Sequence, residues 1–193
     1  MKHMLKKPFT VLTKTAIVAS LLVYPGAVPA FANDTVTSST VRVTFPDVSS
    51  DHFARSHIAK LAASGVVTGY TTGEFAPNNS VSQQEAIVMV IRMMGLEDEA
   101  LAVPDTVFTG LNENKFFTKY VVKALEERII HLVEETEAAG QGDTPWGSRP
   151  ATREWIAKLI VRAIGEQPAS GALIFSDAAE ISPDMAGYVA TAQ

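Results

Sequence analysis

The sequence predicts a mainly α-helical protein made of repeated helix–loop–helix units. Three similar tetrapeptides, FPDV, FTGL and FSDA, begin at positions 45, 108 and 175, and such spacing is typical of repeat proteins. Each is followed by an amphipathic helical pattern, and in the first two units by a loop and a more apolar helical pattern. The predicted units are residues 45–98, residues 108–167 and, as the start of a third, residues 175–193.

The first 32 residues have the pattern of a secretory signal peptide. Four lysines precede a short apolar run, AIVASLLV, and the segment has no acidic residue. Ala30 and Ala32 supply a cleavage signature. The apolar run is shorter than the roughly 20 residues that a membrane span needs. We therefore expect residues 1–32 to be removed on export, with no membrane partner afterwards. The Thr- and Ser-rich residues 33–44 are expected to be a flexible linker.

Charge and composition exclude several classes of function. The net charge is −5, and without the four leader lysines 12 basic residues face 21 acidic ones, which gives −9. This balance argues against nucleic acid as a partner. The chain has no cysteine, so disulfides and cysteine-ligated zinc are impossible. His52 and His57 would lie on different helix faces, and neither a metal site nor a cofactor is expected.

The first unit contains two predicted helices with clear boundaries. The helix within residues 52–67 has an apolar side, and Gly65 suits the position after its end, where a positive φ is needed. The helix that follows starts with a capping box, in which Ser82 stands three residues before Glu85. Gly95 ends it.

The second unit repeats this arrangement with changes. Its first helix, within residues 115–130, carries Arg128 where the first unit has Gly65. Thr152 can cap its second helix, Glu154 favours the positive helix end, and Gly165 ends it. Both second helices are apolar around most of their girth, which predicts that they form a central bundle with the first helices outside.

The first unit resembles the S-layer homology repeat, whose pattern reads F-x-D-V, H-W-A, G-(I/V)-(I/V)-x-G-Y-x-D-G-x-F-x-P and (I/V)-T-R-A-E. It carries FPDV at 45–48, HFA at 52–54, GVV at 65–67, GY at 69–70, GEF at 73–75, Pro77 and VSQQEA at 81–86. The resemblance implies three repeats in a pseudo-threefold helical bundle. Grooves between the repeats would bind secondary cell-wall polysaccharide, bearing pyruvylated amino sugar, without covalent bonds.

The resemblance thus predicts a secreted, non-catalytic anchoring module in the cell wall or S-layer of a Gram-positive bacterium. Two alternatives stay open: the anchoring end of an exported polysaccharide-degrading enzyme, and an S-layer protomer. The acidic residues at 134, 135 and 137 could suggest a hydrolase, but such runs are usually a solvated face, and no catalytic motif is present. Because the third unit stops inside its first helix, we expect exposed apolar faces that destabilise the chain or cause self-association.

The resemblance also indicates where a ligand would bind. The family's arginine lies at the start of the central helix and contacts the anionic sugar; the first repeat has Gln83 there, and the second keeps Arg153. Helix N-termini and arginine forks both bind carboxylates. The expected ligand-binding residues are Arg153, Thr152, Glu154, Trp146, Arg149, Ser82, Gln83, Glu85, Gly69 and Tyr70. The sequence equally allows Tyr70 to be a loop anchor, Glu85 a cap and Trp146 a core residue.

Overall fold

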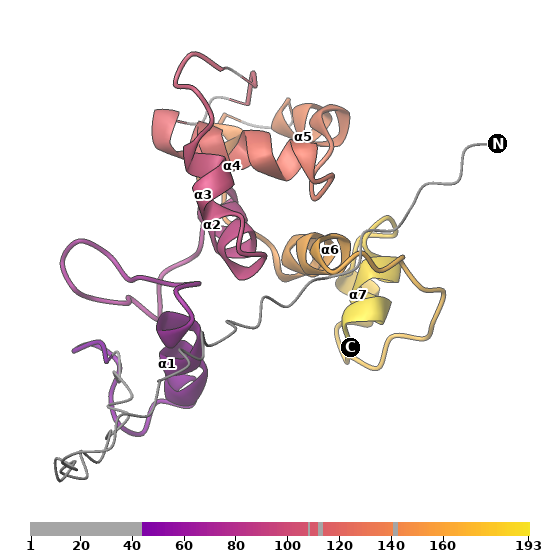
Figure 1. The fold of residues 1–193 in the computed structure, drawn as a ribbon. Helices are drawn as coiled ribbons and strands as arrows, with labels where there is room; N and C mark the ends of the chain where they lie inside the picture. Colours follow the sequence, from indigo (N-terminus) through magenta and orange to yellow (C-terminus); the bar gives the residue numbers. More distant parts are fainter. Residues whose placement is uncertain (1–43, 108, 112–113, 141–142) are drawn as a thin grey trace, which may run out of the picture. The chain divides into compact units, whose positions relative to one another are not determined.

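The all-α class is confirmed by a computed structural model, which describes residues 44–193 except 108, 112–113 and 141–142 (Figure 1). The predicted signal peptide, nearly all of the predicted linker and Phe108 lie outside the described residues. The helices are α1 (Arg55–Ala63), α2 (Gln83–Met93), α3 (Glu97–Leu101), α4 (Lys115–Glu126), α5 (Leu132–Ala139), α6 (Arg153–Ala163) and α7 (Ala186–Ala192), with 3-10 turns η1 (Trp146–Ser148) and η2 (Ala178–Glu180). Within these described parts, no helix is long and apolar enough to cross a membrane.

The second helices of the two repeats, α2 and α6, contact each other and share the main core. Ile87 and Ile91 of α2 and Leu159 of α6 are completely buried there, as is Val121 of α4. Burial of each such side chain contributes about 1.5–3 kcal/mol. The predicted central position of the second helices is therefore correct for α2 and α6.

Each of these central helices also carries the first helix of the following repeat. Helix α4 packs on α2, and α7 packs on α6 (Figure 1). Helix α1 belongs to a separate small core, in which Phe45, Val48 and Ile58 are buried and Phe75 packs against them. Phe53 of the HFA motif precedes this helix and is 90% exposed. The first helix of repeat one thus supports its own loop.

The N-termini of α2 and α6 lie side by side. The backbone N–H of Gln83 donates to the carbonyl of Arg149, and that of Ala151 donates to the carbonyl of Val81, both at 2.8 Å. These bonds form a short antiparallel bridge between the segments that precede the two helices. The predicted capping box of α2 is present, and Thr152 caps α6 by accepting from the Trp155 N–H.

Helix α5 is held against α6 and η1 by buried polar contacts. Glu135 is only 1% exposed, and its carboxylate accepts hydrogen bonds from the indole N–H of Trp146 at 2.9 Å and of Trp155 at 3.3 Å. The ammonium of Lys158 lies 3.1 Å from the same carboxylate. The expectation that this acidic run is a solvated face is wrong for Glu135, because its partners come from η1 and α6, far along the chain.

The neighbouring carboxylate of Glu134 makes the fold sensitive to acid. Burial opposes its charge, but hydrogen bonds from Arg162 and His131 and the charge of Lys158 outweigh burial and lower its pKa from 4.5 to about 2. Its contribution to stability is therefore complete above about pH 5 and is lost as the pH falls towards 2.

We expect acid unfolding to reflect this loss. Because the side chain is 42% exposed, solvent screening reduces the contribution to about 1–2 kcal/mol. The free energy of unfolding should fall by this amount between pH 6 and pH 2, and less in Glu134→Gln. Urea unfolding at each pH measures it, with Glu137→Gln on the exposed side of α5 as control. A parallel decline in both variants would contradict the assignment.

Four helices end in the same hydrogen-bonded motif, but one has an unfavourable residue. After α1, α2 and α6 the residue with positive φ is a glycine, as predicted, whereas after α4 it is Arg128 with φ 59°. The motif is intact there: the Arg128 N–H donates to Leu125 and the Ile129 N–H donates to Ala124. A side chain in this conformation costs about 1–2 kcal/mol.

Arg128→Gly should therefore stabilise the protein. Part of the relieved strain is offset by the greater freedom of glycine in the unfolded chain, so we expect a gain of about 0.5–1 kcal/mol in chemical denaturation. Glu127→Gly, one residue earlier and at φ −79°, is the matched control and should lose stability. Equal losses from the two glycines would show that strain at Arg128 is unimportant.

Candidate ligand-binding groove

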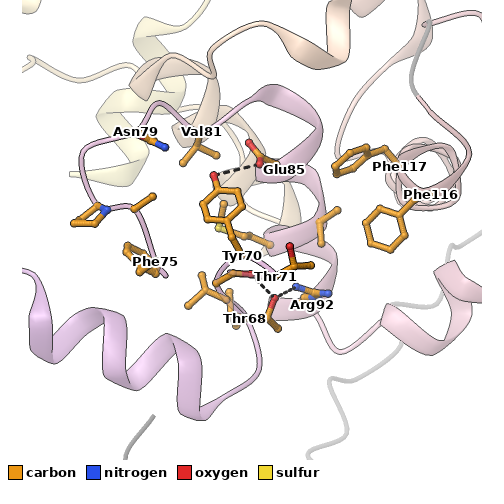
Figure 2. A pocket seen from close by; sticks show the side chains of 17 residues that line it. Thr68, Tyr70, Thr71, Phe75, Asn79, Val81, Glu85, Arg92, Phe116 and Phe117 are labelled. Atoms are coloured by element: carbon orange, nitrogen blue, oxygen red, sulfur yellow. Dashed lines mark hydrogen bonds between the residues drawn. The ribbon is translucent and has the colours of Figure 1, made fainter. Parts of the chain in front are cut away.

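A cavity of about 520 Å³ lies between the loop of repeat one, α2 and the start of α4 (Figure 2). Its walls are residues 66–71, 75–77, 79 and 81 of the loop, Glu85, Val88, Met89 and Arg92 of α2, and Phe116 and Phe117 of α4. We call this cavity the repeat-one groove. It lies between two of the predicted repeats, since its loop and α2 belong to the predicted first repeat and α4 belongs to the predicted second.

The loop wall is fixed by the FPDV motif that begins the repeat. The Asp47 carboxylate accepts from the backbone N–H groups of Phe75 at 2.9 Å and Ala76 at 2.6 Å. These bonds, the one from Phe75 above all, lower the pKa of Asp47. The ring of Phe75 packs on Phe45, with ring centres 5.3 Å apart. The first motif of the repeat thus holds the loop in shape from 28 residues away.

Two aromatic rings are partly exposed along the groove. Tyr70 is 45% exposed and Phe116 is 48% exposed. The Tyr70 hydroxyl reaches towards Glu85, at 3.5 Å from the nearer carboxylate oxygen (Figure 2). Partial burial, followed by the charge of Glu85, raises the pKa of Tyr70, which therefore stays a neutral hydroxyl group. The rings offer apolar faces close to a polar group.

Both charged groups that line the groove already have hydrogen-bond partners, Glu85 in the capping box and Arg92 on α3. The Nε of Arg92 donates to Glu97 at 2.8 Å, and a second guanidinium nitrogen lies 3.5 Å from the Thr68 hydroxyl. Glu97 also accepts from the Tyr120 hydroxyl of α4 at 2.8 Å. The Arg92 bond is the main cause of the lowered pKa of Glu97. Arg92 therefore links α2 to α4 through Glu97 of α3, and its charge is balanced by that carboxylate.

This combination of groups is suited to a neutral or weakly charged sugar. Aromatic rings can cover the apolar C–H face of a sugar ring, while hydroxyl, carboxylate and guanidinium groups bond its hydroxyls. Among the described residues there is no group of three or more His, Asp or Glu placed to hold a metal ion.

Of the residues expected to bind a ligand, three line the repeat-one groove: Gly69, Tyr70 and Glu85. Ser82 lies next to it in the capping box, where its N–H donates to Glu85 at 2.8 Å. Gln83 stands at the first position of α2, and its buried side-chain oxygen has no partner in the described part of the chain.

The residues expected from repeat two do not line this groove. Arg153 is exposed and makes no hydrogen bond or ion pair with any described residue. Thr152 is occupied as a cap, and Glu154 accepts from the N–H and hydroxyl of Ser182 at 2.8 and 2.9 Å. Glu154 therefore connects α6 to the segment that the sequence predicts to begin a third repeat.

Trp146 and Arg149 have structural roles. Trp146 is 1% exposed and donates to Glu135, so its ring has no free face for a ligand. The Arg149 guanidinium donates to the carbonyls of Ala139 at 2.6 Å and Thr144 at 2.9 Å, which satisfies backbone groups at and beyond the end of α5.

Sequence reasoning missed Phe116. Phe116 stands two residues after Asn114, which caps α4 by accepting from two N–H groups. The ring of Phe116 lies beside the buried side of the helix. The available signal was the Phe-Phe pair, which supplies one aromatic ring more than the apolar stripe of α4 needs.

Comparison with known proteins agrees with the resemblance carried by the motifs of repeat one. The family model of the S-layer homology domain matches residues 44–87. Over 154 residues the chain is 27% identical to a surface layer protein of Brevibacillus choshinensis and 26% identical to a middle cell wall protein of Brevibacillus brevis, covering 79% of this chain and 12% and 13% of those proteins. It is also 26% identical over 154 residues to an amylopullulanase of Thermoanaerobacterium thermosulfurigenes, covering 77% of this chain and 8% of that protein.

The chain thus spans at most about an eighth of the length of these relatives. The resemblance predicted from the motifs of repeat one is confirmed. The matched domain and the surface-layer relatives point to a secreted, cell-wall or S-layer location.

Proposed function

We propose that this chain, whose residues 44–87 form an S-layer homology domain, is a non-catalytic module that holds a protein at the cell surface by binding secondary cell-wall polysaccharide. The observation that carries the proposal is the repeat-one groove, where Tyr70 and Phe116 expose their rings on opposite walls. Bound without covalent bonds, a polymer of sugars would stack on these rings and bond to Glu85 and the hydroxyl groups beside it.

An anionic substituent such as a pyruvyl group would need a free cation, and Arg153 supports that part of the proposal. It is at the first position of α6, where the backbone N–H groups and the helix dipole also favour an anion. Its guanidinium has no partner among the described residues, whereas Arg92 and Arg149 are bonded. A positive side chain there is unfavourable for α6 itself, so a ligand role would explain it.

The test is sedimentation of the purified chain with Gram-positive walls, before and after chemical removal of the secondary polysaccharide. Binding should be lost on stripping. Tyr70→Ala and Phe116→Ala should each weaken it about tenfold or more, as expected for rings central to an interface. Arg153→Ala should weaken it only where the polymer carries the acidic substituent.

Phe53→Ala is the matched control, because this ring is 90% exposed but outside the groove. Binding that survives stripping would point to peptidoglycan or nonspecific adhesion. If Phe53→Ala and Tyr70→Ala weaken wall binding equally, the repeat-one groove is not the binding site.

Two wider roles remain compatible with such a module. The amylopullulanase relative supports the anchoring end of an exported enzyme, and the surface layer relative supports an S-layer protomer. Self-association is favoured by exposed apolar side chains on and beyond α6: Ile164 is 60% exposed and Ile174 is 80% exposed. Light scattering over a range of chain concentrations would separate an associating protomer from a monomeric anchor.

A further inference from the structure

The two central helices can be compared position by position, because α2 and α6 are related by a shift of 70 residues. The shift matches the caps Ser82 and Thr152, and the terminal glycines Gly95 and Gly165. The four residues of α2 that line the repeat-one groove are Glu85, Val88, Met89 and Arg92. Their counterparts on α6 are Trp155, Lys158, Leu159 and Arg162.

In repeat two this face of α6 is covered by α5. Trp155 and Lys158 contact the carboxylate of Glu135, and Arg162 holds Glu134 with two nitrogens, each 3.1 Å from a carboxylate oxygen. Leu159 is completely buried. The face that borders a cavity in repeat one thus borders a glutamate pair in repeat two.

The contacts to Glu135 are those of a binding site for a carboxylate. Three donors converge on it: the ammonium of Lys158 and the indole N–H groups of Trp146 and Trp155. All three residues are at most 5% exposed, so the donors are shielded from water. Charge-assisted hydrogen bonds in such surroundings are strong, and a buried donor that lacks an acceptor destabilises the fold.

We propose that α5 occupies the place on α6 that corresponds to the repeat-one groove on α2, and that the face of α6 in contact with it, together with Trp146, is a carboxylate-binding site that Glu135 fills from within the chain. The ligand class is a small carboxylate. This goes beyond the proposed function, which places the wall polymer in the repeat-one groove.

The test empties the site and offers a free carboxylate. Glu135→Ala removes a CH2–COO⁻ unit, which is the size of acetate. It leaves the two indole N–H groups without an acceptor, and it leaves Lys158 only its longer contact to Glu134, at 3.4 Å. In 100 mM sodium chloride the melting temperature of Glu135→Ala should fall by about 10 °C, because the buried ammonium of Lys158 loses its closer partner and two buried indole N–H groups lose their acceptor. In 100 mM sodium acetate at the same pH the melting temperature should recover by at least about 3 °C, and it should keep rising with the logarithm of the acetate concentration.

Tryptophan fluorescence gives a second, local readout. Trp146 and Trp155 are the only tryptophans in the sequence, and both donate to Glu135. Acetate should change the emission of Glu135→Ala along a saturation curve, and the dissociation constant from that curve should also account for the rise in melting temperature. The emission of the parent chain should not change.

Two variants control the experiment. Glu137→Ala removes an exposed glutamate of the same helix, and acetate should affect it no more than chloride does. Adding Lys158→Met to Glu135→Ala removes the cation and should abolish the acetate response. Acetate effects equal to those of chloride, or a response that survives Lys158→Met, would overturn the proposal. If Glu135→Ala does not fold in chloride, acetate should restore folding by circular dichroism, and failure to fold in both salts would also overturn it.

Discussion

Replacing Trp146 with alanine is expected to lower the free energy of unfolding by about 4 kcal/mol. The side chain is 1% exposed and packs edge-on against Trp155, with ring centres 6.4 Å apart. Truncation of a buried tryptophan costs about 3–5 kcal/mol through lost burial and the cavity that remains. The lost N–H also leaves Glu135 with one donor fewer at a site that water does not reach.

Urea unfolding of the parent chain and Trp146→Ala measures this effect. Phe53→Ala is the control, because a ring that is 90% exposed should change stability by no more than about 0.5 kcal/mol. A ligand-contacting Trp146, the alternative that the sequence allowed, would behave like Phe53 in unfolding and differ from it only in wall binding. Near-equal stabilities of the two variants would therefore contradict the buried position.

The case of Trp146 shows why sequence reasoning could predict the helix boundaries but left the role of this loop residue open. Helix boundaries depend on residues a few positions apart: Ser82 and Glu85 form a capping box within one turn, and Gly95 ends α2 by its own conformation. The role of Trp146 depends on Glu135, which lies 11 residues earlier in an acidic run. Nothing local distinguishes that glutamate from its exposed neighbours.

The same reasoning applies to the groove. Gly69, Tyr70 and Glu85 could be identified because the motif and the cap occur within one repeat. Phe116 could not, since it faces this loop only because α4 packs on the central helix of the preceding repeat. That pairing joins residues that are far apart in sequence, and a periodic pattern within one helix does not specify its neighbour.

Gly69→Ala is the second change with a large expected effect. Gly69 has φ 70°, and a Cβ there would lie 2.5 Å from a ring carbon of Phe45 and 2.8 Å from the backbone oxygen of Glu74. Neither neighbour can move easily, because Phe45 is buried in the small core and the Glu74 oxygen accepts from the Tyr70 N–H. Conformational strain and overpacking together should cost about 3 kcal/mol.

Gly73→Ala separates the two causes, since Gly73 has φ 85° but no atom within 4 Å of the added carbon. It should cost about 1 kcal/mol from strain alone. Urea unfolding of the two variants measures the cost in stability, and sedimentation with walls measures the effect on binding. Because the added methyl group at Gly69 displaces the loop wall that carries Tyr70, this variant should lose wall binding as well as stability, while Gly73→Ala should keep most of its binding. Equal costs in unfolding would show that close packing against Phe45 does not fix the loop, and a Gly69→Ala chain that still binds walls fully would place the sugar away from Tyr70.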